Sequence, residues 1–466
     1  MRRVQIACLL LLAGCGGGGG SSPQTAAVSA PNRAPTVASA NADQTATVGA
    51  FFQYDASRSG AAFSDPDGNA LSYRVTVSPA APGLTVAGTV LSGTPTTAGS
   101  HTVTITADDG QGGTANDDFV LQVRLPPDVP VLPATLAGYA DASIALPRHF
   151  TAGPGNPSAA DNTPPGNAVT NAGATLGRVL FYDRRLSAND SVSCGSCHQQ
   201  ARGFADPARF STGFQGGRTN RHSMGLTNAR WYARGRFFWD ERAATLEAQV
   251  LVPIQDATEM GMTIPQLVTK LSTAGFYGPL FTAAFGDPQI TGDRIARALA
   301  QFVRAMASYR SRYDSAFVNG VPNFTVALTA QEELGRNLYE GRARCVVCHG
   351  TVAHISDNLH NNGLDAVVTD AGAGNGRFKS PSLRNVAVRA PFMHDGRFAT
   401  LREVIDHYDS GVRDSANLSP VLRGPDGTPR RLNLTEAEKL ALLAFLGALT
   451  DDALLADPKF ADPFPR

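Results

Sequence analysis

The 466-residue sequence predicts a multidomain protein: an all-β sandwich at its N-terminal end, followed by two mainly α-helical domains. Residues 33–125 contain short runs of alternating apolar and polar residues between Gly- and Asp-rich turns, a pattern typical of β-strands. From about residue 168 the apolar residues recur at helical spacing. A Cys-x-x-Cys-His motif occurs once in each half of this helical region, so we expect one domain for each motif, at 168–322 and 323–466.

The composition indicates a folded chain without a charge-driven partner. Hydrophobic residues make up 42% and charged residues 17%, which is enough for a packed core. Lys+Arg and Asp+Glu both number 40, so the neutral chain lacks the positive field that nucleic-acid binding requires. The longest apolar stretch has about ten residues, whereas a helix needs roughly twenty to span a bilayer.

Residues 1–15 predict an export signal. A basic start and a short apolar stretch precede Leu12-Ala13-Gly14-Cys15, which resembles a lipoprotein lipobox with Cys15 as the lipidated residue. The alternative is an ordinary cleaved signal with a chance cysteine. Residues 16–32 predict a flexible Gly/Ser tether. We therefore expect a periplasmic or cell-surface lipoprotein. No acidic residue directly follows Cys15, which by resemblance to bacterial lipoproteins implies an anchor in the outer membrane rather than the inner one.

The predicted sandwich spans residues 33–125. Its strand candidates are residues 70–77, 101–107 and 119–123. Through residues 63–73 the region resembles the cadherin-like, Ig-like modules of bacterial surface proteins. Its acidic turns are candidates for calcium binding, but Asp and Gly also simply form turns. We expect a spacer or adhesion role here, and the Pro-, Ala-, Gly- and Asn-rich residues 126–167 predict a linker.

The two Cys-x-x-Cys-His motifs predict covalently bound haem. The motifs are Cys194-Gly195-Ser196-Cys197-His198 and Cys345-Val346-Val347-Cys348-His349. On a helical turn both cysteines reach one porphyrin, and the adjacent histidine reaches the iron. A thioredoxin-like pair does not need the histidine, and zinc would need a second ligand pair nearby. With so few Cys and His residues, on the order of 10⁻³ chance matches are expected, so we predict two haems c.

Helix signals surround these motifs. Residues 293–306 have apolar positions at helical spacing. Two capping-box patterns, Thr329 to Glu332 and Thr435 to Glu438, precede apolar-periodic runs, and residues 439–449 are typical of the closing helix of a small cytochrome. Each motif supplies one histidine per iron, so the group at the sixth position decides between electron transfer and peroxide binding.

The segments between and after the motifs carry a family resemblance. They are residues 217–228, 237–242, 246–254, 259–260, 378–385, 390–398 and 400–408. In this order they are similar to the bacterial dihaem cytochrome c peroxidases and the related MauG-type enzymes, over about residues 168–450. The N-terminal sandwich is an addition outside that resemblance.

The resemblance implies roles for five residues. His198 would be the proximal ligand of the peroxidatic haem, and His349 that of the electron-transfer haem. Glu259 matches the distal acid/base and Gln249 the amide that holds peroxide. Trp239 matches the tryptophan between the haems. Without the resemblance, Glu259 is a surface carboxylate and Trp239 a core aromatic residue.

The sequence also departs from the peroxidase pattern. Many family peroxidases carry a second histidine about sixteen residues after the first motif, but residues 210–216, including Phe214, contain none, so we expect an open iron site as in MauG-type enzymes. His222 replaces an asparagine that helps to bind calcium in relatives, which puts calcium in doubt, and it is an alternative iron ligand. For the sixth ligand of the second haem, Tyr408 is preferred over Met393, and His407 is a third candidate.

These observations favour a peroxidase that reduces hydrogen peroxide with electrons from a small periplasmic donor, either a cytochrome c or a cupredoxin. A MauG-like oxidase of a protein or organic substrate shares the same pocket and stays an alternative. A third alternative is a non-catalytic dihaem electron carrier, against which Glu259 and the missing histidine argue.

Overall fold

The computed structural model describes residues 31–124, 129–135, 137–140 and 144–465 in two compact units, Met1–Pro126 and Pro127–Arg466. The predicted signal peptide, Cys15 and most of the tether lie outside the described residues. Within the described part of the chain, no helix is both long and apolar enough to cross a membrane.

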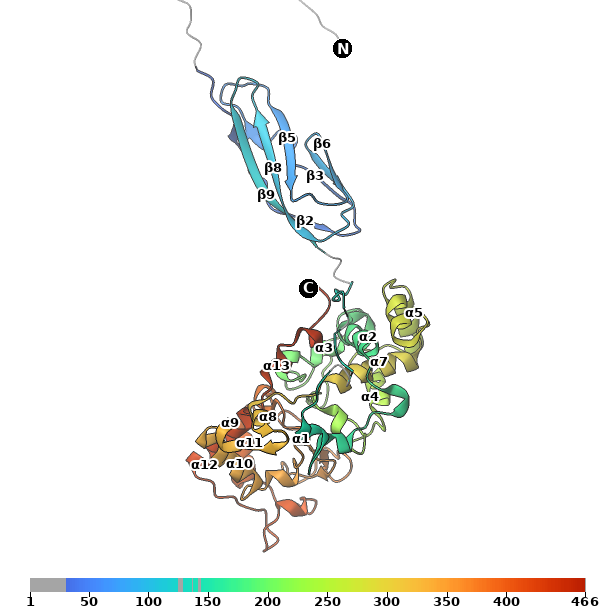
Figure 1. Ribbon diagram of the computed structural model, residues 1–466, viewed down its shortest axis with the longest axis vertical. Coiled ribbons are helices and arrows are strands. Elements are labelled where there is room, and N and C mark those ends of the chain that lie inside the picture. The colour runs from blue at the N-terminus through green and yellow to red at the C-terminus, as the bar shows by residue number, and fades with distance from the viewer. Residues whose placement is uncertain (1–30, 125–128, 136, 141–143, 466) are drawn as a thin grey trace, which may run out of the picture. The chain divides into compact units, whose positions relative to one another are not determined.

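The first unit is built from two antiparallel-rich β-sheets (Figure 1). A four-stranded sheet has the order β2-β9-β8-β5, and a three-stranded sheet has the order β3-β7-β6, with β1 and β4 as a separate pair. The strands are β1 Thr36–Val37, β2 Gln44–Thr47, β3 Phe52–Asp55, β4 Phe63–Ser64, β5 Ser72–Ser78, β6 Leu84–Ala87, β7 Val90–Gly93, β8 Gly99–Asp108 and β9 Thr114–Arg124. The three strand candidates of the sequence thus correspond to β5, β8 and β9.

Alternation places the core of this unit between the sheets. Val103 and Ile105 on β8 and Leu121 on β9 are fully buried. Along each strand the neighbouring residues are more exposed, as expected when alternate side chains point to opposite faces of a sheet. The rings of Tyr54 on β3 and Phe119 on β9 pack edge to face, with centroids 5.4 Å apart, which joins the two sheets. The predicted N-terminal β domain is confirmed.

The second unit is mainly helical. Its helices are α1 Arg148–Thr151, α2 Asn171–Tyr182, α3 Cys194–Cys197, α4 Leu246–Gln255, α5 Ile264–Ser272, α6 Tyr277–Phe285, α7 Gly292–Ala305, α8 Arg312–Ser315, α9 Phe324–Ala327, α10 Ala330–Glu340, α11 Leu401–Asp406, α12 Glu436–Gly447 and α13 Asp452–Leu455. Short strand pairs are β10 Phe317–Val318 with β11 Val321–Pro322, and β12 Leu359–His360 with β13 Phe378–Lys379. Both predicted capping boxes form, at the starts of α10 and α12.

The same helix crossing occurs in both halves of the helical unit. Helix α2 packs on α7 in the first half, and α10 packs on α12 in the second. At Gly177 in α2, an added Cβ would lie 2.0 Å from the carbonyl oxygen of Ala298, and at Gly335 in α10 it would lie 2.0 Å from that of Ala441. Only glycine permits such a close backbone approach. The two halves therefore share this helix crossing, although over their whole length their sequences are not close repeats.

We expect Gly335→Ala to destabilise the helical unit by about 1–3 kcal/mol, because the added methyl group forces α10 and α12 apart. Chemical denaturation followed by far-UV circular dichroism measures the loss. Gly447→Ala is the matched control, because Gly447 ends α12, the helix that α10 crosses, and has no atom within 4 Å of the new Cβ. Equal stability of the two variants would show that the crossing tolerates a wider spacing.

The described part of residues 126–167 differs from the predicted linker, because it packs onto the helical unit. Tyr139, Phe150 and Asn167 are each at most 5% exposed. The ring of Phe150, on α1, packs edge to face on that of Trp231 at 6.2 Å. Isolated anchor residues between Pro and Gly turns leave no periodic pattern, which explains why the sequence predicted a linker. The predicted domains 168–322 and 323–466 likewise lie together in one compact unit.

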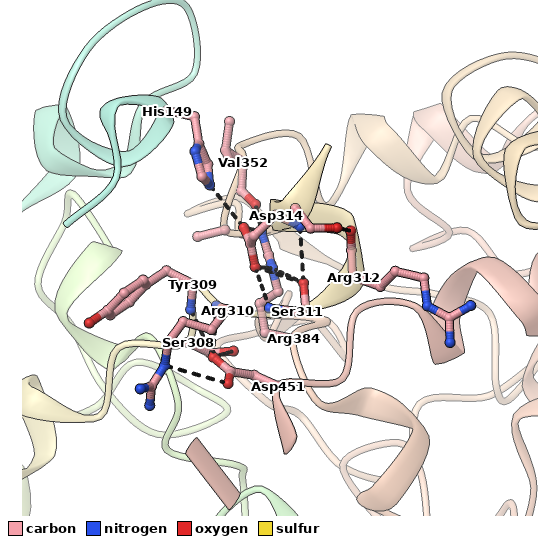
Figure 2. Close-up of polar contacts among 12 residues, drawn as sticks. His149, Ser308, Tyr309, Arg310, Ser311, Arg312, Asp314, Val352, Arg384 and Asp451 are labelled. Carbon is pink, nitrogen blue, oxygen red and sulfur yellow. Dashed lines mark hydrogen bonds and ion pairs between the residues drawn. The ribbon is translucent and has the colours of Figure 1, made fainter. Parts of the chain in front are cut away.

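Two buried carboxylates hold the segment that connects the halves, residues 308–315 (Figure 2). Asp314 is bound by both terminal nitrogens of Arg384, with Nη2 donating to Oδ1 at 2.8 Å, and lies 3.0 Å from Nε2 of His149. Asp451 accepts hydrogen bonds from the backbone N–H groups of Tyr309 and Arg310, each at 3.0 Å. These contacts join the start, the middle and the end of the helical unit.

Candidate functional site

The first Cys-x-x-Cys-His motif lines a cavity in the first half. Cys194 and Cys197, at the two ends of the single-turn helix α3, line it together with His198 and an apolar wall that includes Leu299. His198 Nδ1 lies 2.8 Å from the carbonyl oxygen of Phe204. Because a carbonyl only accepts, Nδ1 carries the proton and Nε2 keeps a lone pair for a metal.

Glu259 and Gln249 line the same cavity as His198. Gln249 lies on α4, and Glu259 lies on the turn that follows this helix, where its backbone N–H donates to Oδ1 of Asp256 at 3.2 Å. Burial raises the pKa of Glu259 to about 7, and the Asp256 carboxylate adds to this effect while Arg242 opposes it. The carboxyl group therefore exchanges a proton near neutral pH.

The loop that lacks a histidine lies directly behind Glu259. The backbone N–H of Phe214 donates to the carbonyl oxygen of Glu259 at 2.9 Å. A Cβ at Gly213 would lie 1.6 Å from the carbonyl oxygen of Thr258, so the two loops touch along their backbones. His222 does not line this cavity but the second one. Met260 also lines the first cavity, and its thioether sulfur is a potential ligand for iron. A role for Met260 was not predicted from the sequence.

The second motif lines a larger cavity of about 250 Å³ in the second half. Cys345, Cys348 and His349 line it, and Leu401 of α11 and Leu442 of α12 contribute to its apolar wall. Both preferred candidates for the sixth ligand, Tyr408 and Met393, also line this cavity, whereas His407 does not.

One amide lies between the two candidate ligands. Asn362 Nδ2 lies 3.4 Å from the hydroxyl of Tyr408 and 3.5 Å from Sδ of Met393. Tyr408 belongs to a π-helical turn, His407–Gly411, and Met393 has a positive φ of 75°, two irregular backbone features that are common at functional sites. Burial raises the pKa of Tyr408 to about 12, although the hydrogen bond with Asn362 opposes this effect. Asn362 was not predicted, because no local signal in the sequence distinguishes it.

The charges of the second cavity match the carboxylates of a haem. In the part of the chain that the structure describes, no Asp or Glu residue lines it, and its basic lining residues are Arg344, Lys379, Arg389 and Arg430. A haem carries two negatively charged propionate groups, and these would pair with the positive charges of the basic side chains that line the cavity. Each cavity thus joins two thiols, an adjacent imidazole and apolar walls, and the residues fit a covalently bound haem c.

Trp239 lies where segments from both halves meet. Its indole N–H donates to the carbonyl oxygen of His222 at 2.8 Å, and its own carbonyl oxygen accepts from the backbone N–H of Lys379 at 2.8 Å. Its ring lies edge-on to the ring of His394, with centroids 6.5 Å apart, and Trp239 lines the second cavity. Lys379 and His394 come from the second half, so Trp239 joins the two halves.

The side chains at the candidate calcium positions make hydrogen bonds within the protein. His222 Nδ1 lies 3.2 Å from the carbonyl oxygen of Ala208, and an imidazole is a poor ligand for a cation that prefers oxygen. In the β unit, Oδ1 of Asp65 accepts from two backbone N–H groups of its own turn, as does Oδ1 of Asp109. Among the described residues, no group of three or more His, Cys, Asp or Glu side chains is placed to hold a metal ion.

Comparisons with known proteins bear on both units. A family model described as "Di-haem cytochrome c peroxidase" matches residues 171–321, and one described as "Putative Ig domain" matches residues 34–124. Methylamine utilization protein MauG of Methylophilus methylotrophus is 32% identical over 301 residues, which cover 62% of this chain and 86% of the relative. A cytochrome-c peroxidase of Pseudomonas sp. (strain SCT) is 30% identical over 342 residues, covering 65% of this chain and 88% of the relative.

The helical unit also resembles a solved structure. The crystal structure of a MauG-like protein associated with microbial copper homeostasis is similar to this chain with a TM-score of 0.59 and 34% sequence identity. The match covers 66% of this chain and 97% of that protein.

Proposed function

This chain belongs to the di-haem cytochrome c peroxidase and MauG family of oxidoreductases, and from that premise we propose that it reduces hydrogen peroxide to water. Electrons would come from a small periplasmic donor, a cytochrome c or a cupredoxin, through the haem of the second cavity. The observation that carries the proposal is the position of Glu259, with a pKa near 7, in the same cavity as His198 and Gln249.

The residues of the first cavity provide the proton transfers that peroxide reduction needs. When bound, the haem supplies an iron that delivers electrons to the O–O bond. The carboxylate of Glu259 accepts the proton of one peroxide oxygen, and the resulting acid donates it to the other oxygen as the bond breaks. The amide of Gln249 orients the peroxide by hydrogen bonding, and the apolar wall excludes competing water. With two electrons and two further protons, one peroxide gives two waters.

The other site residues have roles in ligation and electron transfer. His198 and His349 would each hold one iron through Nε2, and Tyr408 or Met393 would fill the sixth position in the second cavity. Trp239 would pass electrons between the halves, since it lines the second cavity, its indole N–H donates to His222 of the first half, and its carbonyl oxygen accepts from Lys379 of the second half. The four motif cysteines would bind the porphyrins covalently.

The test is steady-state turnover of hydrogen peroxide with reduced cytochrome c as the donor. Oxidation of two cytochromes for each peroxide supports the proposal. The second candidate function, oxidation of a protein or organic substrate at long range, is favoured by Tyr408 in the second cavity, since MauG-type enzymes use tyrosine there. Turnover with an organic donor but not with cytochrome c would favour that candidate, and no turnover at all would favour an electron carrier.

We further propose that the protein is exported to the periplasm or the cell surface and anchored through a lipid on Cys15. The β unit would then act as a spacer between the anchor and the enzyme. Mass spectrometry of the intact protein, which detects the lipid, tests the anchor.

We expect the oxidised protein to give one high-spin and one low-spin haem signal in low-temperature EPR. Among the described residues, His198 is the one histidine that lines the first cavity, so that iron should lack a second histidine ligand, whereas Tyr408 or Met393 should complete the second site. Cyanide should perturb only the high-spin signal. Two low-spin signals would contradict the expectation and indicate that Met260 or a displaced His222 binds the first iron. Loss of the low-spin signal in Tyr408→Phe but not in Met393→Leu would identify the tyrosine as the ligand.

A further inference from the structure

Arg389 is a deeply buried cation without a carboxylate partner among the described residues. It is 6% exposed, its Nη2 donates to the carbonyl oxygen of Ser382, and its Nε is buried without a hydrogen-bond partner. Burial lowers the pKa of Arg389 to about 10, so the guanidinium still carries its charge at neutral pH. A buried charge of this kind normally has a partner of opposite sign.

The side chain lies at the contact between the two halves. A Cβ added at Gly225 would lie 2.5 Å from Nη1 of Arg389, and one added at Gly203 would lie 3.0 Å from Cδ. Gly203 directly precedes Phe204, whose carbonyl oxygen pairs with His198. Arg389 itself belongs to the second half and lines the second cavity, so its charge lies at the side of this cavity that contacts the first half.

The other basic residues of the second cavity are better compensated or less buried. Lys379 Nζ lies 3.2 Å from Oε1 of Glu241 and donates to the carbonyl oxygen of Arg236 at 2.8 Å. Arg344 is exposed, and Arg430 is half-buried. Among these basic side chains, Arg389 therefore combines deep burial with the lack of a carboxylate partner in the described part of the chain.

We propose that Arg389 binds a propionate carboxylate of the haem in the second cavity, at the edge that faces the first half. The inference rests on the proposed function only in assuming a haem in that cavity. A planar guanidinium donates two parallel hydrogen bonds to a carboxylate, and such charge-assisted pairs are strong. A fixed positive charge at this edge favours the reduced haem, because it stabilises an added electron.

The test is a redox titration, at about pH 8, of the holoprotein and of the variants Arg389→Gln, Arg389→Lys and Arg413→Gln. Arg413 is an exposed arginine of the same half, so its variant controls for the change in net charge. A pyridine haemochrome assay first checks that each protein holds two haems. Fewer than two in the unaltered protein would refute the proposed function itself, which separates that failure from a failure of the inference.

We expect Arg389→Gln to lower the equilibrium constant for reduction of the second haem at least about tenfold. For one electron this lowers the reduction potential by about 59 mV. Arg389→Lys should give a smaller shift in potential, since lysine keeps the positive charge but cannot donate two parallel hydrogen bonds. Arg413→Gln should give almost no shift. A shift in Arg389→Gln no larger than that in Arg413→Gln, or one confined to the first haem, would overturn the proposal. If Arg389→Gln does not fold, a crystal structure of the unaltered holoprotein decides the question, because the guanidinium must lie within about 2.7–2.9 Å of a propionate oxygen.

Discussion

Glu259→Gln should lower peroxide turnover by about 10²–10⁴-fold and leave the absorption spectra of both haems unchanged. Gln has the size and hydrogen-bonding capacity of Glu, so the cavity keeps its shape. It cannot accept the proton of peroxide, and that transfer would have to go to solvent. Steady-state kinetics with reduced cytochrome c measures the loss. Glu340→Gln, which changes an exposed glutamate at the end of α10, is the control and should be fully active.

The pH dependence of the same reaction provides a sharper criterion. Because burial raises the pKa of Glu259 to about 7, the reactive carboxylate forms only as the pH rises through that value. The plot of kcat/KM should therefore rise through about pH 7, and this limb should be absent in Glu259→Gln. Asp256→Asn should move the limb to lower pH, because the Asp256 charge raises the pKa of Glu259, while the amide oxygen of Asn still accepts the backbone hydrogen bonds. An unchanged rate in Glu259→Gln would return this residue to the role of a surface carboxylate.

The sequence predicted those features that depend on residues close together in the chain: helix starts, strands and the two haem motifs. The Thr435–Glu438 capping box marks the start of α12, because its hydrogen bonds join residues three apart. The alternation in residues 101–107 gave strand β8, since one buried face imposes that pattern. Each haem motif is complete within five residues. In the same way Gln249 and Glu259 line one cavity because they lie on a helix and on the turn that ends it.

Long-range contacts were outside the reach of such patterns. Asn362 meets both Met393 and Tyr408, which are 31 and 46 residues away in sequence, and nothing near Asn362 indicates this. Arg389 is one of many arginines, and only its burial against two glycines of the first half distinguishes it. The family resemblance supplied roles for Glu259 and Trp239 that residue types alone did not, because a glutamate in a chain with no net charge is most simply a surface residue.

The repeated helix crossing coincides with a short motif in both halves. Gly177 and Gly335 have equivalent contacts with the helix that each one crosses, and each lies in a Leu-Gly-Arg-x-Leu run, at residues 176–180 and 334–338. The run alone does not show which helix the glycine meets, because the backbone-to-backbone approach that requires glycine is a long-range contact.

The second large effect is expected for Asp314→Asn, which should destabilise the helical unit by about 3–5 kcal/mol. Arg384 is fully buried, and its charge would lose the carboxylate that both of its terminal nitrogens contact. His149 would lose the same partner, which loosens the attachment of α1 (Figure 2). Denaturant unfolding of the holoprotein, followed by circular dichroism, measures the loss.

Two further comparisons separate the buried pair from a simple loss of packing. In the double variant Asp314→Leu/Arg384→Met no charge is left unpaired, so it should be more stable than Asp314→Asn, and a strictly additive loss would contradict a coupled pair.

The pH dependence of the stability that Asp314 contributes has a definite sign. Burial opposes ionisation of Asp314, but Arg384, His149 and Ser311 together hold its pKa below the ordinary value. Its stabilisation is therefore complete above about pH 4, the range of an unfolded Asp, and is lost as the pH falls through the folded value. The stability gap between the unaltered protein and Asp314→Asn should accordingly persist at pH 5 and narrow only in strong acid, whereas a gap that closes between about pH 5 and 7 would assign the stabilisation to a histidine instead.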